Sequence, residues 1–239
     1  MKSSIHMTLT RLVIPVVAAI ALVQGASAAF TINYSVEGSP PPAASTLFGP
    51  NGVPAGTETW NQSGAQTVTG LLDAAGAATP ANLNWAVSSS PGVDEWGNSS
   101  IPVLRYSARD FNTDPSNFIT MTLSGLTVGD TYTVWIASGR PSATVTGGWS
   151  TTNTTSTLGT QLIDNSALNN TGTSWVQGNN YVLFNNVVVD LSGNLVMKGV
   201  STGGTRLPFS GFQIAAVPEP SAALLGALGS LALLRRRRA

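Results

Sequence analysis

The chain has no cysteine and a single histidine, His6, which lies close to the amino terminus. The first residues have the pattern of a leader that is removed on export, so the remaining chain contains neither residue type. Their absence excludes Ser-His-Asp and Cys-His nucleophiles and ordinary zinc sites. It does not argue against secretion, because a domain of this size can be stable without disulfides.

Charged side chains are also scarce, at 9% of the residues. The chain as a whole is neutral, but six of its eleven cations lie near the two ends. Between Ala29 and Ala216, five cations are outnumbered by ten carboxylates, which gives this part a net charge of −5. Such a balance provides no basic surface for a phosphate backbone, and nucleic acid is therefore not an expected partner.

Residues 1–28 contain the parts of a secretory signal peptide. Lys2 and Arg11 precede an apolar run, residues 12–23, and a small-x-small site ends at Ala28. This order predicts a signal helix that signal peptidase cleaves after Ala28, with cleavage after Ala29 as the alternative. A retained membrane anchor is disfavoured, because the apolar run is too short to span a bilayer well.

The other end of the chain has a second short apolar run. Residues 222–234 are apolar or small, and Arg235, Arg236, Arg237 and Arg238 follow directly. A helix of this length is about 20 Å long, against a hydrocarbon core of about 30 Å. It can still insert, because arginines snorkel and the bilayer thins locally. The arginines favour the cytoplasmic side, so we expect a short C-terminal transmembrane helix with the domain outside.

Pro218, Glu219 and Pro220 stand just before this apolar run. A Pro-Glu-Pro motif, an apolar helix and a terminal arginine cluster, here residues 217–239, resemble the PEP-CTERM sorting signal. In that family of exported bacterial proteins, a membrane-embedded exosortase recognises the motif and processes the signal. The resemblance implies that the arginine cluster is the cytoplasmic retention element. It also implies that the protein is anchored in the inner membrane before processing and then reaches the cell envelope or extracellular matrix. A plain tail anchor is the alternative.

Between the two signals, residues 29–216 have the pattern of β-strands. Large apolar residues recur at every second position in "FITMTL" and "TYTVWIAS", and Gly-containing turns such as "LTVGDT" separate the runs. Eight or more short strands in one domain predict an all-β, two-sheet antiparallel sandwich of jelly-roll-like topology. The runs "FNNVVVDLSGNLVMKGV" and "LPFSGFQIAAV" are similar to the closing strands of galactose-binding-like jelly rolls, which implies the same kind of sandwich.

The carboxylates form no motif that identifies a metal or catalytic site. Asp110 and Asp114 lie in one polar loop, either as ligands of a structural calcium ion or as turn residues bound to backbone N–H groups. The turn interpretation is favoured, because the loop has no dense Asp-x-Asp pattern. We therefore expect no metal and no cofactor. No carboxylate pair is recognisable as a glycosidase pair, so we expect no catalytic residues and no enzymatic activity.

Six tryptophans lie in the predicted domain. Trp96 stands beside acidic residues, and Trp149 and Trp175 lie in Gly/Thr-rich segments, so these three are candidate sugar contacts. Trp135, in the middle of an alternating strand, and Trp85 are expected in the core. Burial is the usual state of tryptophan in a β-sandwich, so core packing competes with sugar binding at all three candidates.

These features together predict an exported β-sandwich of structural or adhesive role in the cell envelope or extracellular matrix, with extracellular polysaccharide as a candidate partner. The alternative is a carbohydrate-binding module. A carboxylate-dependent enzyme acting on glycans is the less favoured third class. Glycan binding distinguishes the second class from the first, and a cleft with two facing carboxylates would indicate the third.

The sorting interpretation is tested by replacing Pro218, Glu219 and Pro220 together with alanine. We expect the variant to insert in the membrane but to remain unprocessed, because the apolar helix and the arginine cluster are unchanged. The measurement is fractionation of the tagged protein in a host that has its own exosortase. Processing and localisation like those of the parent would mean that the C-terminus is a plain tail anchor.

Overall fold

The computed structural model describes residues 30–36, 59–87, 93–95, 106–108, 118–138, 146–151, 161–164, 175–201, 207–217 and 229. The chain divides into two compact units, one of which is Ala29–Val217, whereas the other comprises Met1–Ala28 and Pro218–Ala239. The expected signal helix lies outside the described residues, as does the expected membrane helix apart from Gly229. Within the described ranges, no helix is both long and apolar enough to cross a membrane.

The unit Ala29–Val217 is built from β-strands. In chain order they are β1 (Thr31–Ser35), β2 (Asn61–Gln62), β3 (Thr67–Val68), β4 (Asn82–Val87), β5 (Val93–Glu95), β6 (Tyr106–Ala108), β7 (Phe118–Ser124), β8 (Thr131–Ala137), β9 (Thr146–Thr151), β10 (Gln161–Asp164), β11 (Tyr181–Val188), β12 (Leu195–Ser201) and β13 (Gly211–Ala216).

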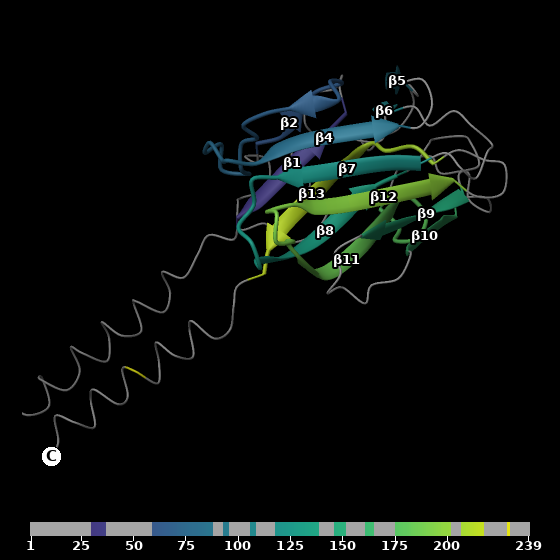
Figure 1. Cartoon of the computed structure of the whole chain (residues 1–239). Coiled ribbons are helices and arrows are strands. Elements are labelled where there is room, and N and C mark those ends of the chain that lie inside the picture. Colours follow the sequence, from purple (N-terminus) through teal and green to yellow (C-terminus); the bar gives the residue numbers. More distant parts are fainter. Residues whose placement is uncertain are drawn as a thin grey trace, which may run out of the picture. The chain divides into compact units, whose positions relative to one another are not determined.

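Two sheets form the sandwich, and Figure 1 shows them as two layers. The β8 sheet has the order β11-β8-β13-β1-β2, and the β7 sheet has the order β10-β9-β12-β7-β4-β3. β5 and β6 form a separate pair. Neighbouring strands are antiparallel, except that β1 and β2 are parallel. The prediction of an all-β, two-sheet antiparallel sandwich is confirmed.

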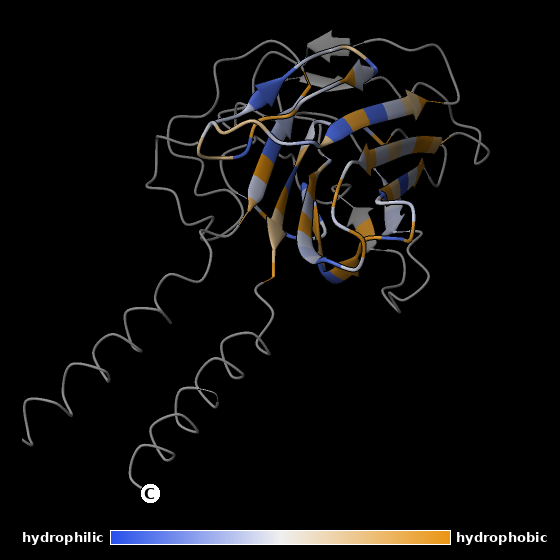
Figure 2. Cartoon of the chain, turned by 60° about the vertical axis from the view of Figure 1, so that its left-hand side comes forward, coloured by the Kyte–Doolittle hydropathy of each residue, from blue (hydrophilic) through white to orange (hydrophobic). Residues whose placement is uncertain are grey.

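Alternation along the strands assigns one face of each sheet to the core. In β7 and β8, every second residue from Ile119 and from Tyr132 is buried, and apolar and polar residues alternate visibly along the ribbons in Figure 2. Aromatic rings fill the space between the sheets. The Tyr34 ring stacks on that of Phe212 at a centroid distance of 5.4 Å, and Trp149 meets Phe209 edge to face at 6.0 Å. Burial of such rings supplies much of the favourable free energy of folding.

A β-bulge keeps the edge strand β11 in phase with the core. Phe184 is opposite Val134 and Val187 is opposite Tyr132, so β11 has one more residue than β8 over this stretch. Asn186 accommodates the extra residue with a φ of 58°, a conformation that asparagine tolerates better than most residues. Phe184 and Val187 are therefore both buried, although strict alternation would expose one of them.

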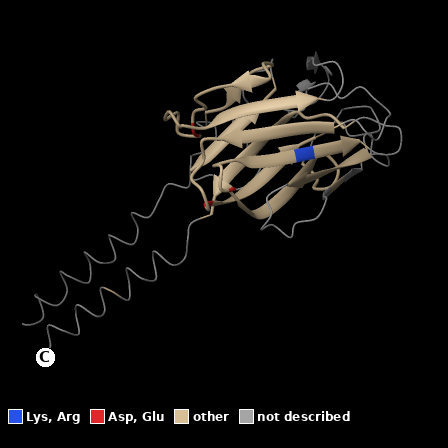
Figure 3. Ribbon diagram, in the orientation of Figure 1, with Lys and Arg blue, Asp and Glu red and all other residues tan. Residues whose placement is uncertain are grey.

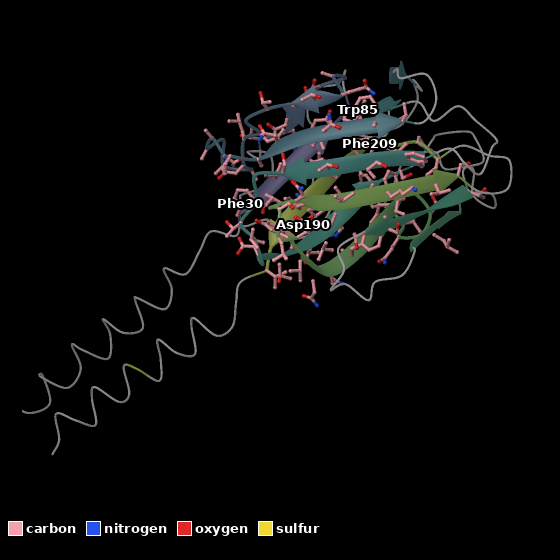
Figure 4. The ribbon with its side chains drawn as sticks, viewed as in Figure 1. Phe30, Trp85, Asp190 and Phe209 are labelled. Atoms are coloured by element: carbon pink, nitrogen blue, oxygen red, sulfur yellow. The ribbon has the colours of Figure 1, made fainter. Side chains whose placement is uncertain are left out.

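The two ends of the sandwich differ in their connections. Tight turns join β7 to β8 and β11 to β12, and they meet where the Leu126 N–H donates to the Gly193 carbonyl. Both ends of the described domain, Phe30 and Val217, lie at this same end, as Figure 4 shows for Phe30 and Asp190. We call it the terminal end. The opposite end, where β1, β4, β8, β10 and β12 finish, is the distal end.

Gly125 is the glycine with the least room for a side chain among these turns. Its φ is 79°, and an added Cβ would overlap the carbonyl group of Pro80. We expect Gly125→Ala to lower the free energy of unfolding by about 3 kcal/mol, from the left-handed backbone and the displaced Pro80 together. Gly129→Ala is the matched control, because its φ is 85° but nothing lies within 4 Å of the added atom. Urea unfolding measures both; equal losses would contradict the packing argument.

Tyr132 gives the sandwich a pH dependence at the alkaline side. Burial, together with the nearby charge of Asp130, raises the pKa of Tyr132 from 10.0 to about 12. Its contribution to stability is therefore complete below pH 10 and is lost as the pH rises from about 10 to about 12. We expect wild-type stability to fall more than that of Tyr132→Phe across this window. Parallel unfolding curves for the two proteins would show that Tyr132 does not titrate there.

Candidate functional site

The outer face of the β8 sheet, opposite to the core, has an unusual set of residues. The cross-strand register places Leu183, Trp135, Gln213 and Asn33 in one row across β11, β8, β13 and β1. Their neighbours along each strand are buried in the core, so these four side chains belong to the outer face. An outer face of an antiparallel sheet normally meets water, yet Asn33 and Gln213 are buried here.

An aromatic cluster lies at the distal end of this face. It consists of Trp60, Trp135, Trp175 and Tyr181, gathered around the small residue Ala137. Trp175 and Tyr181 meet edge to face with ring centroids 5.8 Å apart. Trp60 is 8% exposed, whereas Trp135, Trp175 and Tyr181 are partly exposed. The cluster is thus separate from the core and partly open to solvent.

A short turn before β11 holds Trp175 in place. The Asn180 side chain accepts a hydrogen bond from the Val176 N–H at 2.9 Å, and the Asn180 N–H donates back to the Val176 carbonyl at 3.1 Å. The Gly178 N–H donates to the Tyr181 carbonyl at 2.8 Å, which closes the turn against β11. These bonds fix the backbone on both sides of the Trp175–Tyr181 ring pair.

Two asparagine side chains hold Trp60 against the sheet, and we call this arrangement the amide clamp. Asn33 of β1 donates its Nδ2 to the Thr59 carbonyl at 3.1 Å. Asn61 of β2 donates to the Asn33 carbonyl at 3.0 Å and to the Leu72 carbonyl at 2.8 Å, and its Oδ1 accepts from the Leu72 N–H at 2.9 Å. Trp60 lies between these two anchors in sequence. The clamp therefore fixes the segment that brings the Trp60 indole to the β8 sheet.

The surroundings of the aromatic cluster are polar but uncharged. None of the described side chains on the outer face of the β8 sheet is ionisable apart from Tyr181. The single cation in the described part of the chain, Lys198, belongs to β12 of the other sheet, where its Nζ lies 4.4 Å from the centroid of the Phe118 ring (Figure 3). Partly exposed rings beside amides suit a ligand with apolar faces and hydroxyl groups.

Two of the described carboxylates, Asp73 and Asp190, have hydrogen bonds that define their role. The described ranges contain no group of three or more His, Cys, Asp or Glu that could hold a metal ion. Asp190 accepts from the N–H groups of Ser192 and Asn194, both at 2.8 Å, and Asp73 closes its turn in the same way. These two carboxylates are turn residues. Asp110 and Asp114, the loop considered for calcium, lie outside the described residues.

The three tryptophans predicted as sugar contacts have different positions. Trp175 belongs to the aromatic cluster. Trp149 is fully buried between the sheets against Phe209, so its ring is not available to a ligand and this prediction is corrected. Trp96 lies outside the described residues, as do the sites of signal cleavage and the C-terminal sorting residues.

Sequence reasoning missed three members of the cluster, Trp60, Trp135 and Tyr181. Trp135 was expected in the core, but it alternates with Val134 and Ile136 and shares its face with Thr131 and Thr133. The phase of the strand therefore already indicated the outer face. Trp60 had no comparable signal, because β2 is only two residues long and the amide clamp that positions it is a tertiary contact. Trp85 is buried in the core as expected.

Comparisons with known proteins find likeness only among solved structures. No protein-family model matches the sequence, and no curated protein matches it. A carbohydrate-binding module of family 61, determined with beta-1,4-galactotriose, is 13% identical with a TM-score of 0.33 over 56% of this chain and 88% of that chain.

Two structures from Clostridium thermocellum are similarly distant, each over 56% of this chain. The CBM22-1–GH10 modules of endo-1,4-beta-D-xylanase 10B, complexed with xylohexaose, are 11% identical with a TM-score of 0.34 and 26% of that chain covered. A family 35 carbohydrate-binding module is 9% identical with a TM-score of 0.31 and 91% of its chain covered. Likeness at this level concerns the β-sandwich alone.

Proposed function

We propose that this protein is a carbohydrate-binding protein and that the aromatic cluster on the outer face of the β8 sheet binds a neutral glycan. One observation supports this most strongly. Trp135, Trp175 and Tyr181 remain partly exposed on the face of a sheet whose other face already forms the core. Large aromatic side chains that cluster at the solvent-exposed surface are typical of binding sites.

The physical basis is the match between ring faces and sugars. The carbon–hydrogen faces of a pyranose are apolar, and burying them against indole or phenol rings removes apolar area from water. The hydroxyl groups around the ring edge require donors and acceptors, which the amides of the outer face supply. Because no described side chain of this face is charged at neutral pH, the geometry favours a neutral oligosaccharide over an acidic one.

The position of the aromatic cluster fits an exported protein that is attached through its C-terminus. Residues Ala137 and Tyr181 of the cluster lie at the distal end, whereas Phe30 and Val217 lie at the terminal end. If the sorting signal at Pro218, Glu219 and Pro220 acts as expected, attachment would follow Val217 directly in sequence. The glycan site would then lie at the opposite end of the domain from the attachment point, where an extracellular polysaccharide is accessible.

An enzyme that cleaves glycans is not proposed. A retaining or inverting glycosidase needs two carboxyl groups that flank the substrate. The described carboxylates with known partners, Asp73 and Asp190, are bound in turns and do not belong to the aromatic cluster. A purely structural role makes a different prediction from glycan binding, since it requires no ligand at the cluster.

Trp135→Ala tests the proposed function. We expect the full chain to bind at least one of cellohexaose, xylohexaose, mannohexaose and β-1,4-galactotriose, and Trp135→Ala to weaken that binding about tenfold through loss of a stacking ring. The measurement is titration calorimetry. Phe118→Ala is the matched control, because Phe118 is a partly exposed aromatic residue on the outer face of the other sheet. Absence of binding to all four glycans, or equal losses in both variants, would contradict the proposal.

A further inference from the structure

Two buried polar groups on the outer face of the β8 sheet have no hydrogen-bond partner. One is Oε1 of Gln213, a residue that is 1% exposed, and the other is Nε1 of Trp60, which is 8% exposed. Buried polar groups are nearly always paired in folded proteins, because an unpaired group has lost its water without replacement. The two groups are also complementary, since the indole N–H only donates and the amide oxygen only accepts.

The hydrogen bonds around Gln213 fix which of its amide atoms is unpaired. The Thr59 carbonyl can only accept, so Asn33 must direct its Nδ2 toward it, at 3.1 Å. The Oδ1 of Asn33 then faces Gln213 and can only accept, so Gln213 must direct its Nε2 there, at 2.6 Å. The remaining atom of the Gln213 amide is therefore Oε1. The unpaired atom is an acceptor, and the ligand group that satisfies it must be a donor.

The same hydrogen bonds connect Gln213 to the segment that carries Trp60. Gln213 bonds to Asn33, Asn33 bonds to the carbonyl of Thr59, and Thr59 is the residue before Trp60. On its other side, Gln213 is the direct register partner of Trp135. The unpaired acceptor thus lies on the sheet beside Trp135, and the unpaired donor belongs to the indole of Trp60, which is in the same aromatic cluster as Trp135.

Unpaired polar atoms also occur at Trp85, Trp149 and Ser210, but their surroundings differ from those of Trp60 and Gln213. Trp85 and Trp149 belong to the core between the sheets, where no ligand can enter without opening the sheets, and Ser210 is fully buried beside β13. Trp60 and Gln213 differ from these residues, because the indole of Trp60 belongs to the partly exposed aromatic cluster and Gln213 is the register neighbour of its member Trp135.

We infer that Gln213 and Trp60 together recognise one hydroxyl group of the bound glycan. The hydroxyl hydrogen donates to Oε1 of Gln213, and the hydroxyl oxygen accepts from Nε1–H of Trp60. This inference rests on the proposed function and makes Gln213 and Trp60 its specificity-determining residues. Because both atoms are buried, binding requires the Trp60 indole to turn outward, while the amide clamp holds the backbone around it.

Calorimetry with Gln213→Met and Trp60→Phe tests this pair, with xylohexaose and β-1,4-galactotriose as probes. Each variant removes one of the two groups and keeps an apolar or aromatic side chain of similar shape. We expect each to weaken binding about tenfold, as for the loss of one buried hydrogen bond, and the double variant to lose clearly less than the product of the two. Gln66→Met is the matched control, because Gln66 is exposed beside β3 of the other sheet.

A second measurement is NMR of the unchanged protein, for which the Trp60→Phe variant serves only to assign one signal. The indole N–H signal of Trp60, identified as the one missing in Trp60→Phe, should move on titration with the probe that binds. The signals of the buried Trp85 and Trp149 should stay in place.

The outcomes separate the two proposals. In one outcome, the wild-type protein binds a probe and both variants bind it equally well but melt at a lower temperature. The unpaired groups then bind water rather than the glycan. This inference would be wrong, whereas the proposed function would stand. The inference is also wrong if the affinity losses of the two single variants multiply in the double variant, or if the indole N–H signal of Trp60 does not move. Either result would mean that the two residues do not bind one hydroxyl group. If the wild type binds neither these probes nor the other two glycans, the proposed function fails and this inference fails with it.

Discussion

The amide clamp is the interaction on which the outer face of the β8 sheet depends. Asn33 donates to the Thr59 carbonyl, and Asn61 bonds to Asn33 and Leu72, which holds the chain around Trp60 against β1. The Oδ1 of Asn33 accepts from Gln213 and so links the clamp to β13. Small residues make this approach sterically feasible, because Ala137 and Gly211 are neighbours on β8 and β13 where the aromatic cluster forms. Without the clamp, the row of buried amides would be open to water and Trp60 would have no fixed position. The candidate site is thus a second, smaller packing unit built on the outside of the sandwich.

The sandwich and its external cluster have opposite physical requirements. Inside, alternating residues of both sheets pack aromatic and aliphatic side chains at high density, and small residues such as Gly199 exist because the Trp149 ring fills the space beside them. Outside, the aromatic cluster keeps polar atoms beside its rings and leaves some of them unpaired. A protein gains no stability from such an arrangement, since unpaired buried groups are costly. Recognition of a hydroxylated ligand is a function that would explain its presence.

The fold was predictable from the sequence because it depends on local signals. Period-two alternation in β7 and β8, with Gly-containing turns between them, is enough to indicate an antiparallel sandwich, and the structure has it. The site was predictable only in part. Trp175 was expected to contact sugar and does lie in the cluster. Trp149 was also expected to contact sugar but is buried in the core, whereas Trp135 was expected in the core but lies on the outer face. The pairing of Gln213 with Asn33 spans 180 residues, so no local pattern could have revealed it.

The central claim is that a glycan binds on the outer face of the β8 sheet, at Trp135, Trp175 and Tyr181. The most direct measurement is a crystal structure of the full chain grown with an oligosaccharide that it binds in solution. The account predicts a sugar ring stacked on at least one of these three side chains, with a hydroxyl within hydrogen-bonding distance of the Gln213 Oε1. A sugar bound instead on the outer face of the β7 sheet, or only at residues outside the aromatic cluster, would contradict it.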